Sequence, residues 1–165
     1  MASKKNIQPF YKNWFFWILI AVSVGYFSTR DTNKPAPTID YMTALKEKAF
    51  SELAAAMKIP LGTKVFHSII VHKSNGKPVM LGDRFVNPLF APDYLKQDFT
   101  KINPSKYLMG VVPPTDIEHV IEAGLPDGQT QKLLEITSHE PCLYLHRQTW
   151  SGEGVVTHSR MIYPG

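Results

Sequence analysis

The sequence is poor in the residues that build covalent cross-links and metal clusters. Cys142 is the one cysteine among 165 residues, which excludes an intramolecular disulfide and a cysteine-based zinc site. The six histidines show no H-E-x-x-H or similar ligand spacing, so the sequence predicts neither a metal site nor any other cofactor. The nucleophile-elbow motif of hydrolases is also missing, and no catalytic residue is predicted.

Charged residues are few, and the excess of positive charge lies in the N-terminal residues. Charged residues make up 19% of the chain, and the net charge is +4. Residues 1–34 carry five basic residues and one acidic residue, whereas residues 35–165 carry 13 of each. A duplex-binding domain needs clustered cations to displace counterions from phosphates. The balanced charge of residues 35–165 therefore predicts no direct contact with nucleic acid.

One long apolar run stands near the N-terminus. Residues 14–27 are apolar or small, and no charged residue occurs between Lys12 and Arg30. This length is at the lower limit for crossing a bilayer, and the aromatic residues at both ends favour its interfaces. The run predicts one transmembrane helix over residues 13–29. A cleaved signal peptide and a buried core helix are the alternatives.

The run divides the chain into four predicted parts. Residues 1–12 form a basic tail, residues 13–29 the transmembrane helix, residues 30–38 a polar linker with two prolines, and residues 39–165 the folded domain. This organisation predicts a single-pass protein of the inner (cell) membrane. The preceding lysines favour an exported domain, and the side of the membrane is left open.

The folded domain alternates between helix and strand signals. Met42, Leu45, Ala49 and Leu53 recur at helical spacing and predict a helix over residues 40–57. Further helices are expected over residues 88–99, 104–109 and 127–135. Strands are expected over residues 65–73, 78–87, 115–125, 142–150 and 155–163. Together these elements predict an α+β domain, an antiparallel sheet with helices packed on it.

Six separate strings of the domain carry a family resemblance. They are Val71–Val79, Gly82–Pro88, Ala91–Phe99, Thr115–His119, Thr149–Gly152 and Val156–Arg160. In this order and spacing they resemble the effector-binding (UTRA) domain of GntR-type transcriptional repressors, and within it the histidine-utilisation repressor subgroup. The resemblance covers residues 40–165. It implies a chorismate lyase-like fold with a pocket for a small, often anionic metabolite.

The sequence departs from the family pattern in three places. Family repressors carry a winged-helix DNA-binding domain where this chain has its apolar run. Gly82 stands where the family usually has an acidic residue, and the last family strand usually continues beyond Gly165. These departures support a further interpretation, a truncated fragment of a transcription repressor.

Arg84 is the first candidate for binding a ligand. It lies in the middle of a predicted strand among apolar neighbours. A guanidinium in such a place needs a carboxylate, because it offers a rigid fork of hydrogen-bond donors. The carboxylate comes either from a ligand or from the protein, with Glu118 or Asp116 as the internal candidates.

Four more residues complete the predicted ligand site. Arg147 and Arg160 lie on the last two predicted strands, where they face either a pocket or solvent. Tyr107 is a candidate for stacking on a ligand ring, with core packing as the alternative. Glu118 or a histidine is the candidate for the other end of the ligand. His119 points to the opposite face from Glu118 and is interpreted as a core histidine.

Two functions from different classes follow. The first is a binding module for a small carboxylate-bearing metabolite, by resemblance a urocanate-like imidazole acid, with Arg84 and Arg160 on the carboxylate. This interpretation predicts no enzyme activity. The second is a chorismate lyase-like enzyme with Glu118 as its acid, which is an analogy from the fold. The resemblance also implies a homodimer, because family repressors are usually dimers.

Overall fold

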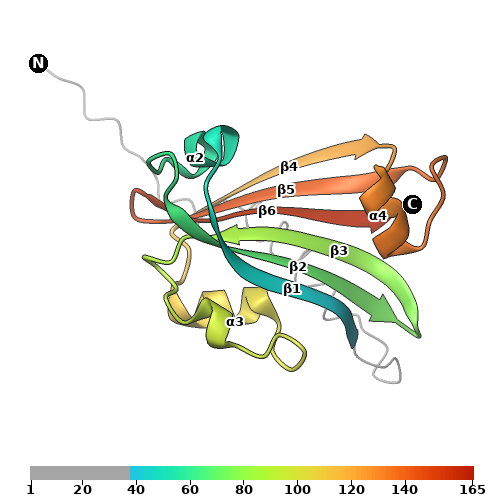
Figure 1. Cartoon of the computed structure of the whole chain (residues 1–165), viewed down its shortest axis with the longest axis horizontal. Helices are drawn as coiled ribbons and strands as arrows, with labels where there is room; N and C mark the ends of the chain where they lie inside the picture. The colour runs from blue at the N-terminus through green and yellow to red at the C-terminus, as the bar shows by residue number, and fades with distance from the viewer. Residues whose placement is uncertain (1–37) are drawn as a thin grey trace, which may run out of the picture. The chain divides into compact units, whose positions relative to one another are not determined.

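A single antiparallel sheet forms the centre of the fold. The computed structural model describes residues 38–165, and the sheet has six strands in the order β1-β2-β3-β6-β5-β4. Every neighbouring pair in this order runs antiparallel. Figure 1 shows the strands side by side, with β1 and β4 at the two edges. This arrangement confirms the predicted α+β fold with an antiparallel sheet.

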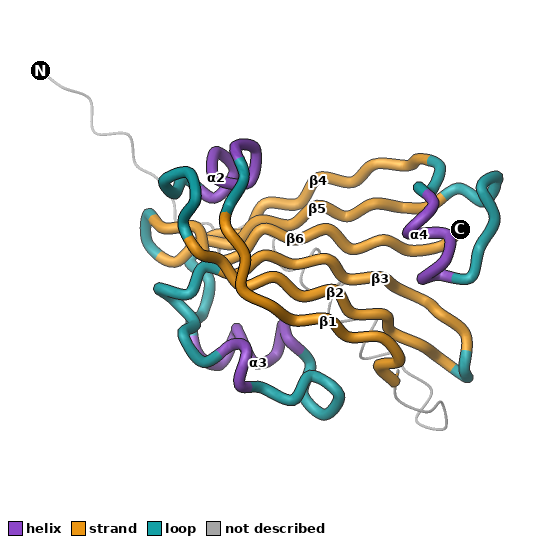
Figure 2. Tube along the Cα trace, in the orientation of Figure 1, coloured by secondary structure: helices purple, strands orange, loops and turns teal. Residues whose placement is uncertain are grey.

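The described elements have the following bounds. The strands are β1 (Thr38–Lys48), β2 (Lys64–Ser74), β3 (Lys77–Val86), β4 (Asp116–Gly124), β5 (Cys142–Ser151) and β6 (Gly154–Pro164). The helices are α2 (Ser51–Met57), α3 (Pro104–Val111) and α4 (Gly128–Leu134), with a 3-10 turn over Tyr94–Lys96. Figure 2 shows how much of this part of the chain is strand.

The element order repeats once along the domain. An N-terminal half, β1-α2-β2-β3, is followed by a C-terminal half, β4-α4-β5-β6, and the halves meet where β3 pairs with β6. Each half ends in a tight hairpin. Asn75 and Gly76 turn the first hairpin with φ of 53° and 75°, and Gly152 turns the second with φ of 59°. Glycine and asparagine adopt this left-handed conformation more easily than other residues.

Helices cover both faces of the sheet. On one face, called here the α3 face, Phe66, Ile70 and Val86 pack against Tyr94, Phe99 and other residues of the connection that contains α3. On the other, called the α2/α4 face, α2 packs over Val65 and Val155, while α4 packs over Val71, Leu81 and Ile162. Figure 1 shows α2 and α4 near opposite ends of the strands.

Two predicted helices are wrong in whole or in part. Residues 40–48 of the predicted helix 40–57 lie in strand β1 (Thr38–Lys48), and only Ser51–Met57 is helical. Ten register pairs with β2 satisfy the backbone groups on the inner side of β1, so sheet pairing outweighs the helical spacing of its apolar residues. The predicted helix 88–99 is reduced to the 3-10 turn Tyr94–Lys96.

The predicted tail, transmembrane helix and most of the linker, residues 1–37, lie outside the described residues. The domain boundaries placed there stay predictions. Within residues 38–165, no helix is long and apolar enough to span a membrane.

Candidate functional site

Arg84 and Arg147 lie on the same face of the sheet. Arg84 of β3 pairs in register with Ser159 of β6, and Ser159 pairs with Arg147 of β5. The row continues to His119 of β4, which pairs with Arg147. Since directly paired residues of antiparallel strands point to the same side, these four side chains form one polar row on the α3 face.

Neither guanidinium has a carboxylate partner among the described residues. Arg84 Nη2 donates to the Ser105 hydroxyl of α3 at 2.9 Å, and Arg147 Nε donates to His119 Nε2 at 2.7 Å. The ion pairs of the described residues include neither arginine. The expected internal pairing of Arg84 with Glu118 or Asp116 is therefore not formed.

Burial and neighbouring positive charge lower the pKa values of the basic groups on this face. Burial, followed by the charge of Arg84, lowers the pKa of Arg147. Burial and the charge of Arg147 lower the pKa of His119, and burial with the charge of Arg84 lowers the pKa of His72 to about 4. His119 accepts from Arg147 through Nε2, so the neutral ring carries its proton on Nδ1. Both histidines are neutral at pH 7, and the two arginines supply the positive charge.

A cavity of about 70 Å³ lies between this row and α3. Its polar wall is Arg84, Arg147, Ser105, Ser159, Thr149 and Thr157. Its apolar wall is formed by Leu108, Met109, Val112, Pro114, Ile117 and Val156. Two guanidiniums, four hydroxyls and an apolar wall suit a small organic anion, because ligand pockets combine apolar lining with a few placed polar groups.

Helix α3 positions one of these hydroxyls. Asn103 caps the helix, and its side-chain oxygen accepts from the backbone N–H of Ser105 at 2.8 Å and of Lys106 at 3.3 Å. Pro104 occupies the first turn, where its missing N–H costs nothing. The cap therefore fixes the first turn of α3, which carries Ser105 to Arg84.

Removing this cap is expected to weaken both the fold and the site. Asn103→Ala should lower the free energy of unfolding by about 1 kcal/mol, the usual value of a helix N-cap. Asn103→Asp should keep most of that stability, because its carboxylate accepts the same bonds. Urea denaturation of the three proteins measures the difference, and equal stability of wild type and Asn103→Ala would contradict the role of the cap.

The structure separates the other predicted site residues from this row. Arg160 pairs with Asp83 in the β3–β6 register and lies on the α2/α4 face, with its Nη2 at 3.3 Å from Asp83 Oδ2. Arg84 and Arg160 thus lie on opposite faces and do not hold one carboxylate. The structure brings Arg84 together with Arg147 and not, as predicted, with Arg160.

Glu118 and Tyr107 also lie away from the two guanidiniums. Glu118 of β4 is exposed and pairs with Gln148, on the α2/α4 face. Tyr107 of α3 packs near Tyr94 and Phe99, with ring centroids 6.2 and 6.3 Å apart. Its contacts are those of the core beneath α3.

Sequence reasoning missed Ser105 and Ser159 as site residues and assigned His119 to the core. Alternation along β6 is the signal for Ser159, because it separates this residue from Arg160. Ser105 gives no comparable signal, since its contact with Arg84 depends on how α3 packs on the sheet. Within residues 38–165, no group of three or more histidine, cysteine or acidic side chains is arranged to bind a metal ion.

Comparison with known families identifies the class of protein. The family model of the UTRA domain matches residues 34–165. This chain therefore belongs to the UTRA domain family. The match confirms the resemblance to the effector-binding domain of GntR-type repressors, and it makes the domain a ligand-sensing one.

The most informative relatives are histidine utilization repressors. The chain is 51% identical over 124 residues to the histidine utilization repressor of Pseudomonas putida, a match that covers 75% of this chain and 50% of the relative. It is 44% identical over 112 residues to the one of Klebsiella aerogenes, covering 68% and 46%. The chain thus spans about half the length of the curated relatives that it matches. These relatives are repressors rather than enzymes, in agreement with the non-enzymatic interpretation.

A solved structure supports the same assignment. The C-terminal domain of histidine utilization repressor from Pseudomonas syringae pv. tomato is 50% identical and superposes with a TM-score of 0.76, covering 78% of this chain and 92% of that one. The effector domain of PhnF from Mycobacterium smegmatis is 18% identical, with a TM-score of 0.70 and coverage of 90% and 88%. The second likeness shows the fold alone.

The predicted localisation needs correction. The relatives that are about 50% identical over the matched region are named as repressors, and this finding overturns the predicted inner-membrane location. The apolar run of residues 13–29, on which that prediction depended, lies outside the described residues.

Proposed function

We propose that this domain senses a small carboxylate-bearing metabolite in the cavity between the α3 face and helix α3. The observation that supports the proposal is the pair Arg84 and Arg147, two half-buried guanidiniums that face one cavity without a carboxylate from the described residues. A buried cation is normally paired. A ligand carboxylate supplies the missing anion and relieves the repulsion between the two arginines.

The rest of the cavity suits the other end of such a ligand. His119 holds the Nε atom of Arg147 and leaves the remaining guanidinium nitrogens for the cavity. The hydroxyl oxygens of Ser159 and Thr157, which are hydrogen-bonded to the Arg147 carbonyl and the Thr149 hydroxyl, add acceptor positions beside an apolar wall. A flat, unsaturated acid with a polar ring fits this combination. The names of the relatives connect them with histidine utilization, so imidazole acids of the urocanate type are the first candidates.

Ligand entry is coupled to α3. A cavity of about 70 Å³ is smaller than the usual pocket of roughly 300 Å³ or more for a drug-sized ligand. We infer that a ligand larger than this space moves α3 outward as it enters. The bond from Arg84 to Ser105 is the polar contact that a ligand carboxylate replaces, so binding releases the first turn of α3 from the sheet. This displacement is the signal that we propose for the domain.

The proposal is tested by calorimetric titration of the full chain with urocanate and with its methyl ester. Urocanate should release heat and raise the melting temperature, while the ester should bind at least about tenfold more weakly, because hydrogen bonds to a charged group contribute about 1.5–3 kcal/mol. Imidazole and acetate serve as controls for the two ends of the molecule. Equal binding of acid and ester, or no heat from any carboxylic acid, would overturn the proposal.

A second part of the proposal concerns what the domain regulates. We infer that the domain is the sensing part of a transcription regulator, since its curated relatives are repressors and it covers about half of their length. The homodimer implied by the family resemblance stays a prediction, which sedimentation of the full chain with and without ligand tests.

A further inference from the structure

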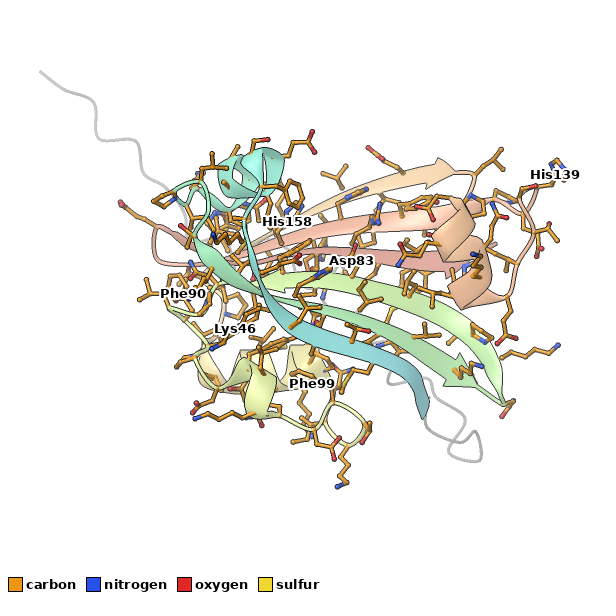
Figure 3. The ribbon with its side chains drawn as sticks, viewed as in Figure 1. Lys46, Asp83, Phe90, Phe99, His139 and His158 are labelled. Atoms are coloured by element: carbon orange, nitrogen blue, oxygen red, sulfur yellow. The ribbon has the colours of Figure 1, made fainter. Side chains whose placement is uncertain are left out.

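A second network of charged side chains lies on the opposite face of the sheet. Four strands contribute one residue each, in the order Glu47 of β1, His67 of β2, Asp83 of β3 and Arg160 of β6. Figure 3 places Asp83 near the middle of the sheet, between α2 and α4. The acidic and basic members alternate, so the network has no net charge when His67 is protonated.

Both ring nitrogens of His67 contact carboxylates. Nε2 lies 2.7 Å from Asp83 Oδ1, and Nδ1 forms an ion pair with Glu47 Oε1. Carboxylate oxygens only accept hydrogen bonds, and a neutral imidazole has a single N–H to donate. A carboxylate beside each ring nitrogen favours the imidazolium form, in which Nε2 donates to Asp83 and the charged ring forms an ion pair with Glu47.

The surroundings of His67 make these contacts stronger than those on an open surface. The His67 side chain is 16% exposed and that of Asp83 20%, while Glu47 is 34% exposed. The His67 ring stacks on Phe85, with centroids 4.1 Å apart and planes 12° apart, and Phe50 packs on the edge of Phe85. Aromatic rings thus exclude water from one side of the network.

Strand β1 joins this network through Glu47. It is an edge strand, and in the sheet it pairs only with β2. The contact of Glu47 with His67 adds a side-chain link to this backbone pairing, and Asp83 extends the link to the third strand. Because β1 begins at Thr38, it is also the element that continues directly into the preceding residues of the chain.

We propose that Glu47, His67 and Asp83 form a proton-dependent clasp that fixes edge strand β1 to the sheet. Protonated His67 bridges the two carboxylates. Loss of the proton removes one of the two N–H donors of the ring. The neutral ring then lies between two negatively charged carboxylates. Glu47 then loses its partner, and β1 opens more often. The clasp makes the connection between the domain and the chain that precedes it responsive to pH.

The direction of the pH effect follows from the groups around His67. Burial alone lowers the pKa of His67, but the hydrogen bond and charge of Asp83, together with Glu47, outweigh burial and raise it above 6.5. Stability from a raised histidine pKa is complete below the unfolded pKa and is lost as the pH rises through the folded one. Arg160 pairs with Asp83 from β6, and His158 of the same strand, whose pKa is lowered by burial, stays neutral in that range.

Hydrogen exchange of the full chain tests the clasp. Exchange of the peptide covering residues 38–48 is followed by mass spectrometry between pH 6 and pH 9 and corrected for the intrinsic pH dependence of exchange. In the wild type, protection of β1 should fall by about threefold to tenfold across this range, a size set by a partly exposed charge-assisted contact. Protection of β5 and β6 should stay constant.

Three variants separate the clasp from general destabilisation. His67→Gln and Glu47→Gln should each abolish the pH dependence of β1 protection, and Glu47→Gln serves if His67→Gln folds poorly. His146→Gln is the matched control, because His146 lies on the same face beside Glu122 and away from β1. Nitrogen NMR should show both ring nitrogens of His67 protonated at pH 6. One unprotonated ring nitrogen, or the same pH profile in wild type and Glu47→Gln, would overturn the proposal.

Discussion

Arg84→Gln is expected to weaken binding of a carboxylate ligand by about 10- to 150-fold. The change removes charge-assisted hydrogen bonds, each of which contributes about 1.5–3 kcal/mol, and it leaves Arg147 to hold the carboxylate alone. Arg147→Gln should give a loss of similar size, because the two guanidiniums share one cavity. Arg84→Lys should recover only part of the affinity, since an ammonium lacks the planar fork of donors. Calorimetric titration with urocanate measures all three.

Arg160→Gln is the matched control for this experiment. It removes the same charge from the same sheet, but on the α2/α4 face, where Arg160 pairs with Asp83. Binding should change by less than about threefold. The free energy of unfolding without ligand should not fall in Arg84→Gln, because the change removes a cation that lies close to Arg147. A large loss of affinity in Arg160→Gln together with normal binding in Arg84→Gln would refute the assignment of the site.

Tyr94→Ala is expected to lower the free energy of unfolding by about 3–5 kcal/mol, as aromatic-to-alanine changes in a core do. Tyr94 is fully buried and packs on Phe99, with ring centroids 4.6 Å apart. Its hydroxyl forms a 2.8 Å hydrogen bond with buried Ser68, which the change leaves without this partner. Domains of this size have a total stability of about 5–15 kcal/mol, so the loss is a large fraction of it.

One further variant separates the contribution of the Tyr94 hydroxyl from that of the ring, and a second serves as a control. Tyr94→Phe keeps the ring and removes the bond to Ser68, so it should cost about 1–2 kcal/mol. Leu89→Ala serves as the control, since Leu89 is 82% exposed and should change stability by less than about 0.5 kcal/mol. Urea denaturation followed by circular dichroism measures each variant. A Tyr94→Ala protein as stable as Leu89→Ala would show that the layer beneath α3 is not part of the core.

Local signals in the sequence predict most of the strands and two helices. Asn75 and Gly76 define the first hairpin, and Asn103 with Pro104 marks the start of α3. Asp127 caps α4 through the backbone N–H of Thr130. These features depend on residues a few positions apart, so they are present in the sequence itself.

Strand β1 shows where local signals fail. Met42, Leu45 and Ala49 have helical spacing, yet Met42 and Leu45 lie on an extended edge strand and remain about 40% exposed. Ala49, by contrast, is buried together with Leu53 of α2. The choice of strand over helix depends on pairing with β2, which no short window of sequence contains.

The sequence indicates an arginine-containing candidate site, but it does not show which arginines lie together. Arg84, predicted from its place among apolar residues, lines the cavity, and its role in binding stays a prediction. Alternation along the strand places Glu118 and His119 on opposite faces, as the register of β4 on β5 confirms. Which arginine joins Arg84 depends on the register of β3 on β6, and a shift by one residue would exchange Ser159 for Arg160. That register is set by the packing of the whole sheet.

The meeting of the two halves at β3 and β6 has a consequence for the order of folding. Contacts inside each half are short in sequence, such as the 12 residues between Ser159 and Arg147, whereas Asp83 and Arg160 across the seam are 77 residues apart. Long-range closure is slow because the chain must lose more entropy before contacts form. Arg84 and Arg147 belong to different halves, so the two arginines of the proposed ligand site come together only after β3 has paired with β6. We therefore expect a chain that has not yet formed this pairing to bind no carboxylate ligand.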